Sequence, residues 1–307
     1  MEKNATHTPI YTKTQGGVIV QTGNSSNFTM RDSSAYLAIK QRGLELQELY
    51  RKNDLVVHPE SYLSKLIEDT AMLSDAWLCN DEGHMKISYL FSASQLNRIA
   101  TAALPLRVSE QAKEYLSALL IGSLDLLNRE RSKAKDTLWE LELWQALARM
   151  GMHATLEEPD IVVSFDGARI GIACKKFYSE NNVSKVLSQA VSQLEGNFDF
   201  GMIAINLDDL TPPNNILKAT SIDQMLEMIS QLNFSFIRRH ERHFRKYLEP
   251  GRAIAAFVST SVISDVITAK PRFNNSRQST LWTIPELSSK KAEQMRNFFN
   301  AVNSAHV

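Results

Sequence analysis

The residues with the clearest potential for chemistry lie in one short stretch, PDIVVSFDGARIGIACKK, which runs from Pro159 to Lys176. An aspartate opens its first apolar run, and two lysines close its second. The dipeptide Asp166-Gly167 between the runs predicts a two-residue hairpin loop, because a type I′ turn needs positive φ at both central residues. Such a loop fixes the strand register, so the sequence predicts that Asp160 lies opposite Ala173.

Side chains alternate along a strand, so Lys175 is expected on the same face as Asp160 and Ala173, with Cys174 on the face left for the core. Two acids that face each other across a hairpin can share a divalent cation such as Mg²⁺. A lysine two residues further on can stabilise the attacking water or the charge that builds on a phosphate. Ala173 occupies the position where the second acid would complete such a site.

The preceding segment, DTLWELELWQALARMG, carries two glutamates that helical geometry separates. The spacing places Glu140 near the middle of an apolar stripe and Glu142 on the opposite face. The stripe consists of Leu143, Trp144, Leu147 and Met150. A glutamate within an apolar face is costly unless it is paired, hydrogen-bonded or bound to a metal. We therefore expect Glu140 to belong to the site and Glu142 to be solvated.

A helical glutamate, a Pro-Asp pair, a hairpin ending in x-x-Lys and a following amphipathic helix together resemble the PD-(D/E)xK phosphodiesterase superfamily. The resemblance covers roughly residues 131–210 and implies a restriction-endonuclease-like fold. By this resemblance, Glu140 matches the glutamate of the first helix and Asp160 matches the aspartate of the Pro-Asp pair. Ala173, Cys174 and Lys175 match the (D/E)-x-K tripeptide, and the chain departs from the motif at Ala173.

The resemblance implies a metal-dependent nuclease that acts on nucleic acid, with DNA favoured, in a bacterial defence or restriction system. Glu140, Asp160 and Lys175 would be catalytic. Mg²⁺ or Mn²⁺ would be held by Asp160, Glu140 and the backbone carbonyl of Cys174. Accessory roles would fall to Lys176, Gln189 and Gln193. Many proteins of this fold act as dimers, so a homo-oligomer is expected.

Three interpretations of Ala173 remain open. The native residue could be glutamate, which would make this chain an inactivated variant. The chain could instead be a naturally degenerate relative that keeps the fold as a nucleic-acid or protein-binding scaffold. The acid could also have moved, with Glu180 the nearest candidate in sequence. The retention of Glu140, Asp160 and Lys175 slightly favours the first. With one acid missing, we expect weak metal binding and little hydrolysis by this chain.

A second informative stretch, NFSFIRRHERHFRKYL, concentrates positive charge on one face of an expected helix. The cations are Arg238, Arg239, Arg242, Arg245 and Lys246. The face could follow a phosphate backbone or could simply be solvated, and the sequence favours neither. Aromatic and aliphatic residues occupy the other side together with His240 and His243, which we expect to be core histidines hydrogen-bonded to the backbone.

The pattern divides the chain into three parts. Residues 1–33 form a tail with one candidate β-hairpin, in which a Gly-Asn-Ser turn interrupts GGVIVQTGNSSNFTM. Residues 34–130 form a helical module that would recognise a partner. Residues 131–307 form the nuclease-like domain, with strands at FGMIAINL and RAIAAFVSTSVI, a helix between them and a closing helix. The predicted class is α/β, a mixed sheet flanked by helices and preceded by an all-helical module.

Composition limits the remaining function classes. The 307 residues are 43% hydrophobic with a formal net charge of zero, which excludes a disordered chain and a globally basic one. A nucleic-acid surface must therefore be local. The two cysteines fit neither a disulfide framework nor a zinc spacing. The polar start and the absence of a run of about 20 apolar residues predict a cytoplasmic protein without a membrane partner.

Overall fold

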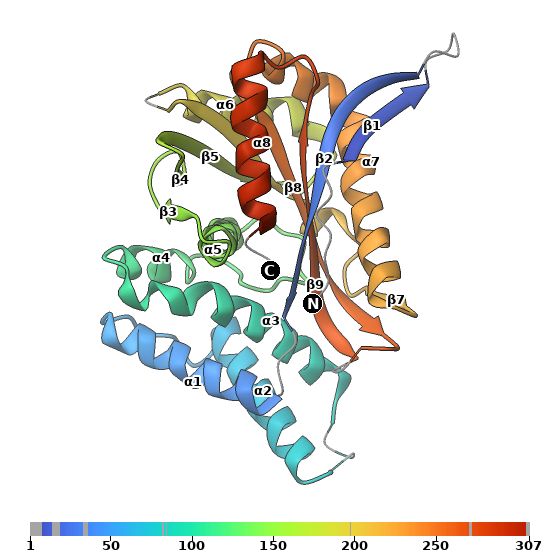
Figure 1. Ribbon diagram of the computed structural model, residues 1–307. Helices are drawn as coiled ribbons and strands as arrows, with labels where there is room; N and C mark the ends of the chain where they lie inside the picture. The colour runs from blue at the N-terminus through green and yellow to red at the C-terminus, as the bar shows by residue number, and fades with distance from the viewer. Residues whose placement is uncertain are drawn as a thin grey trace.

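The computed structural model describes residues 8–13, 19–32, 36–81, 83, 85–196, 198–269 and 272–304. It shows a mixed α/β architecture in which a group of helices precedes most of a large sheet (Figure 1). Within these residues the sheet has nine strands, in the order β1-β2-β9-β8-β6-β5-β4-β3, with β7 paired to β8 beside this path. The predicted mixed sheet flanked by helices is confirmed at this level.

Helices α1 (Tyr36–Lys52), α2 (Tyr62–Leu78), α3 (Ile87–Ala103) and α4 (Ala112–Ala118) form the helical module. The side chain of Ser61 caps α2 by accepting the backbone N–H of Ser64. The helical pattern expected from 109 to 130 is confirmed only for α4, and the chain then turns. Gly122 adopts a φ of +83° in the turn after α4, a conformation that favours glycine.

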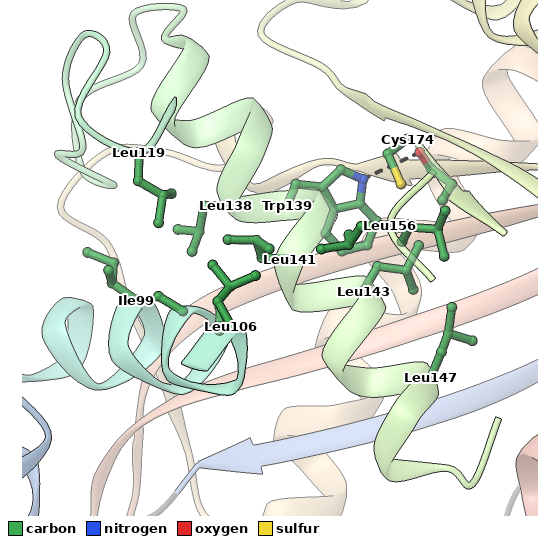
Figure 2. Close-up of a cluster of buried hydrophobic side chains, with 14 of the residues drawn as sticks. Ile99, Leu106, Leu119, Leu138, Trp139, Leu141, Leu143, Leu147, Leu156 and Cys174 are labelled. Atoms are coloured by element: carbon green, nitrogen blue, oxygen red, sulfur yellow. Dashed lines mark hydrogen bonds between the residues drawn. The ribbon is translucent and has the colours of Figure 1, made fainter. Parts of the chain in front are cut away.

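Helix α5 (Lys133–Arg149) lies between the helical module and the sheet (Figure 2). Leu138 and Leu141 pack in one apolar cluster with residues of the module such as Leu106. On the side of the sheet, Trp139 donates its indole N–H to the backbone carbonyl of Ala204 at 3.4 Å. The cluster continues from the module to one face of the sheet, so both share a core that holds α5 in place.

Seven strands of the sheet follow the helical module in the described residues: β3 (His153–Thr155), β4 (Ile161–Phe165), β5 (Ala168–Lys176), β6 (Phe200–Asn206), β7 (Ile216–Ala219), β8 (Ala255–Val266) and β9 (Phe273–Thr283). The predicted hairpin is confirmed, because Phe165 pairs with Ala168 in an antiparallel β4–β5 ladder. Asp166 and Gly167 have φ of +51° and +74°. Strand β5 then pairs in parallel with β6, and β6 with β8.

Helices α6 (Val183–Leu194) and α7 (Ile222–Leu248) cover the face of the sheet opposite α5. Helix α8 (Ser289–Ser304) packs on the same face as α5, where Phe298 contacts Phe165 with ring centroids 5.8 Å apart. Both faces of β5 are therefore buried along most of its length. None of the described helices combines the length and apolarity that crossing a bilayer requires.

The N-terminal segment belongs to the sheet. Strands β1 (Thr8–Lys13) and β2 (Ile19–Asp32) pair with each other, and β2 also pairs with β9. The Gly-Asn-Ser cluster at 23–25 lies inside β2, so the prediction of a turn there was wrong. Ladders on both sides of β2 outweigh the local turn preference, and the cluster adjoins a register shift between β1 and β2, where glycine commonly accompanies a bulge.

Candidate active site at the edge of strand β5

Strand β5 extends beyond its neighbour β4. The β4–β5 ladder ends at the pair Ile161–Ile172, whereas β5 remains paired with β6 as far as Lys176. Successive residues of a strand direct their backbone groups to opposite sides. The N–H and C=O of Cys174 therefore point toward the side of β4, where the ladder has ended and the edge is open.

Asp160, just before β4, fills this edge. Its Oδ2 accepts the backbone N–H of Cys174 at 2.6 Å, which continues the ladder with a side chain in place of a strand. The Nζ of Lys175 lies 3.5 Å from the same oxygen and donates to the carbonyl oxygen of Cys174 at 3.0 Å. A carboxylate, a backbone carbonyl and an ammonium group thus converge at the open edge, as the hairpin register predicts.

Glu140 reaches the same place from α5. Burial and the negative charge of Asp160 raise its pKa to about 7, against the opposing effect of Lys133 and Lys175. Burial also raises the pKa of Asp160, although Lys175 and the N–H of Cys174 act to lower it. Both acids therefore retain protons more readily than in water, chiefly because burial disfavours the ionised carboxylate.

These groups line a cleft of about 760 Å³ between the start of α5 and the outer face of α6. Gln189 and Gln193 lie along its α6 wall, where the resemblance predicted accessory residues. The amide of Gln193 donates to the backbone carbonyl of Pro159 at 3.3 Å and so ties α6 to the residue before Asp160. The cleft is wide enough for a small ligand in addition to water, since pockets for such ligands span about 300–1,000 Å³.

Ala173 does not lie at the surface of this cleft. It is fully buried in an apolar cluster beneath α6 with Phe177, Val183 and Leu187. The sequence predicted the face of Ala173 but not that α6 would cover it. The side chain of Lys175 leaves the same face of β5 as that of Ala173, yet it reaches the cleft. It does so because Lys175 lies near the end of the strand and its side chain is long.

Lys176 also lines the cleft, but its ammonium group is already engaged. It contacts Oδ2 of Asp209 at 2.6 Å and Oδ1 of Asn206 at 2.6 Å, and its side chain is only 4% exposed. Lys176 therefore joins the end of β5 to the turn after β6. Sequence analysis missed Asp209, whose only signal was its place in the Asp-Asp pair that follows the strand FGMIAINL.

The expectation that Glu142 is solvated was wrong. Glu142 is 5% exposed, and its carboxylate pairs with Arg98 of α3 and with Arg277 of β9. Burial raises its pKa, but Arg277 and Arg98 lower the pKa further, so the net direction is downward. The polar face of α5 would be solvated only if no other element packed on it, and here α3 and β9 pack on it.

The basic row on α7 is confirmed in part. Its apolar side is buried, whereas Arg238, Arg242 and Lys246 are exposed. Arg239 contacts Glu180 at 2.7 Å, and Arg245 contacts Glu241 at 2.8 Å. Two of the five cations are thus offset by acids.

Glu180 and His240 differ from expectation. Glu180 bonds Arg239 and lies outside the lining of the cleft, so it does not supply the missing acid. The Nε2 of His240 lies 2.6 Å from Oε2 of Glu180, so this histidine pairs with a carboxylate and not with the backbone. His243 lies beside it, with ring centroids 6.2 Å apart.

Comparison of the chain with protein-family models, curated proteins and solved structures finds no match. Across the described residues, no group of three or more His, Cys, Asp or Glu side chains is placed to hold a metal ion. Any metal at the cleft would have to use the two acids together with a backbone oxygen, water or substrate.

Proposed function

We propose that the chain is a metal-dependent nuclease of the PD-(D/E)xK type, with DNA as the favoured substrate, whose hydrolysis is impaired by alanine at 173. The observation that carries the proposal is the meeting of Asp160, Lys175 and the carbonyl of Cys174 at one open strand edge, with Glu140 entering from the side. Carboxylates that could hold a metal ion and a lysine that could face a phosphate thus meet at one point, and only the acid at 173 is missing from the motif.

The donor set fits a weak magnesium site. Mg²⁺ typically keeps several waters and binds through one or two carboxylates plus the phosphates of its substrate. Asp160, Glu140 and the carbonyl oxygen of Cys174 would hold Mg²⁺ or Mn²⁺, and a bound cation would favour the ionised form of the two acids, whose pKa values burial raises. When bound, the ion would polarise the phosphate and lower the pKa of an attacking water.

Lys175 has a role that needs no metal. Its ammonium group lies between an acid and a carbonyl oxygen, so it is oriented toward the point where a phosphate would enter. Phosphates further along the strand would contact Arg131 and Lys133 at the start of α5 and the exposed cations of α7. A role in bacterial defence, recognition of a partner by the helical module and assembly as a homo-oligomer rest on analogy of architecture.

The decisive experiment restores an acid at 173. Ala173→Glu is compared with Ala173→Gln, which has nearly the same size but cannot bind a metal through a carboxylate. Each protein is incubated with Mg²⁺ or Mn²⁺ and with single- and double-stranded DNA and RNA. We expect metal-dependent cleavage by Ala173→Glu only, and its loss when Asp160→Asn is added.

Position 173 is buried, so folding is controlled by circular dichroism and thermal unfolding of both variants. The two share the cost of added volume, and the glutamate carries the further cost of burying a charge unless a cation accompanies it. Mg²⁺ should therefore raise the melting temperature of Ala173→Glu more than that of Ala173→Gln. A folded Ala173→Glu protein that binds the metal and cuts none of the four substrates contradicts the proposal.

A second candidate is a degenerate scaffold that binds nucleic acid or protein without catalysis. It is favoured by the burial of Ala173 in an apolar cluster and by the lack of a three-ligand metal group in the described parts of the chain. The scaffold predicts binding that is independent of Mg²⁺ and unaffected by Asp160→Asn. Isothermal titration of the unmodified chain with Mg²⁺, with and without an oligonucleotide, separates the two candidates.

A further inference from the structure

Tyr178 presents an aromatic ring at the floor of the cleft, two residues beyond the end of β5. Its hydroxyl donates to Oδ1 of Asp136 at 2.8 Å and accepts the backbone N–H of Ser132 at 3.4 Å. Both partners belong to the start of α5. The ring is therefore held in one orientation before any ligand arrives.

One face of this ring is covered by two buried lysines. The Nζ atoms of Lys135 and Lys176 lie 5.0 and 5.8 Å from the ring centroid. Both ammonium groups contact the carboxylate of Asp209, at 3.1 and 2.6 Å. Since they share one carboxylate, they lie on the same side of the ring, where cation–π attraction holds it. Tyr178 itself is only half-buried and lines the cleft, and the opposite face of its ring is the one that a ligand would use.

Two other parts of the cleft offer different contacts, one through uncharged amides and one through positive charges. The wall formed by α6 and the turn before it offers uncharged amides, Asn182, Gln189 and Gln193, which can hydrogen-bond to the edges of bases. Arg131 and Lys133, at the start of α5, supply positive charge for phosphates. In a duplex the faces of the bases are stacked on one another, so only an unpaired base could use an aromatic ring here.

We infer that the cleft takes an unpaired stretch of nucleic acid and stacks one of its bases on the face of Tyr178 opposite the two lysines. The inference rests on the proposed function and adds the substrate class, a single strand or a frayed end. Stacking of a base on an aromatic side chain tolerates any base sequence, because every base has a π-face. Tyr178 is thus a binding residue, placed next to Lys176 and close to the acids.

The first test changes the ligand and leaves the protein intact. The unmodified chain is titrated, without divalent metal, with a single-stranded DNA oligonucleotide, with an abasic oligonucleotide of equal phosphate number and with a duplex. We expect the base-containing strand to bind about 5- to 150-fold more tightly than the abasic one, and more tightly than the duplex. Equal affinity for the first two, or preference for the duplex, overturns the inference.

The second test changes the ring. Tyr178→Phe keeps the ring and removes the hydroxyl, whereas Tyr178→Leu removes both. The matched control is Tyr89→Leu in the helical module, because Tyr89 is also half-buried and has a lysine ammonium, that of Lys86, 5.4 Å from its ring centroid. We expect Tyr178→Leu alone to lose the preference for bases over abasic sites.

Two results in this series overturn the inference. If Tyr178→Phe and Tyr178→Leu weaken binding equally, the bond to Asp136 matters and the ring does not. If Tyr178→Leu retains the full preference for bases, no base stacks at this position. Should Tyr178→Leu fail to fold, the comparison of base-containing and abasic strands on the unmodified chain still decides.

Failure of this inference differs from failure of the proposed function. A chain that prefers duplex DNA, and that cuts it after Ala173→Glu, loses the single-strand assignment but remains a nuclease. A chain that binds no nucleic acid of any form, and whose Ala173→Glu variant cuts nothing, contradicts both. Binding titration and cleavage are separate readouts, so the two outcomes cannot be confused.

Discussion

Glu140 and Glu142 stand two residues apart on the same helix, yet their surroundings act on them in opposite directions. At the cleft, burial and Asp160 raise the pKa of Glu140 to about 7. On the other side of α5, Arg277 and Arg98 outweigh burial and lower the pKa of Glu142. Charge that is left partly uncompensated beside a cleft is typical of a functional site, whereas fully paired buried charge is typical of a scaffold.

The buried ion pairs around Glu142, here called the paired region, link the helical module to α5 and to the sheet. Arg98 of α3 contacts both Glu142 and Asp208, and Oδ1 of Asp208 accepts the backbone N–H of Ser261 in β8 at 2.7 Å. The next residue, Asp209, pairs with Lys135 and Lys176. Two adjacent aspartates therefore connect the helical module to the lysines beside the cleft.

The largest change in stability is expected when the paired region is disrupted. Arg98→Met leaves the carboxylates of Glu142 and Asp208 without their shared partner in a nearly dry environment, so we expect the free energy of unfolding to fall by about 3–5 kcal/mol. Chemical denaturation measures it. Lys40→Met is the control, since it removes an exposed pair with Asp75 and should cost no more than about 1 kcal/mol. Equal losses would mean that the buried pairs contribute no more than a surface pair.

The next prediction concerns pH. The pKa of Glu140 rises from 4.5 to about 7 on folding, so the folded state binds the proton more tightly and the acid's contribution to stability is lost as the pH increases between these values. Glu140→Gln should therefore be more stable than the unmodified chain at pH 8, by at most about 3 kcal/mol, and the gain should vanish near pH 4.

Glu142→Gln provides the opposite case on the same helix. Its pKa is lowered on folding, so its ionised form stabilises the protein above its unfolded pKa, and the variant should lose stability at pH 8. Thermal unfolding from pH 4 to 8 compares the two. If both variants change stability in the same direction at pH 8, the contrast between the two glutamates does not hold.

A smaller effect is expected from Lys175 on the pKa values of the two acids at the cleft. Lys175 lowers the pKa of both Glu140 and Asp160, so Lys175→Met should raise both. Carboxyl chemical shifts followed by NMR during a pH titration measure the change. Lys185→Met removes an exposed lysine at the start of α6, outside the lining of the cleft, and should leave both titrations in place. Unchanged titrations in Lys175→Met would place its ammonium group away from the acids.

The smallest effect is expected for the exposed cations of α7, on the salt dependence of DNA binding. Charge reversal at Arg238, Arg242 and Lys246 should reduce the slope of log affinity for single-stranded DNA against log salt by about 2 or more, since each phosphate contact contributes about 0.7. Arg245→Met is the control, because Arg245 is already paired with Glu241 and should contribute little. An unchanged slope in the triple variant would make this row a solvated face and confine binding to the cleft.

Strand β9 shows what the sequence pattern could not predict. Its sequence, FNNSRQSTLWT, contains few apolar residues and shows no alternation of apolar and polar residues, so it resembles a loop. The strand nevertheless lies between β2 and β8, and several of its polar side chains find partners within the core, as in the bond between the hydroxyls of Ser279 and Ser259 at 2.9 Å. A buried strand whose polar atoms find partners needs no apolar alternation, and those partners come from other strands.

The sequence by itself determined the local geometry of the site. Asp166-Gly167 fixed the turn and so brought Asp160 to Lys175, because a two-residue loop leaves one register. Only the tertiary structure decided which groups are covered or paired. Arg98 meets Glu142 from 44 residues away and Asp208 from 110, and α6 buries Ala173. Turn and helix geometry act over a few residues, whereas burial and charge pairing depend on segments that only folding brings together.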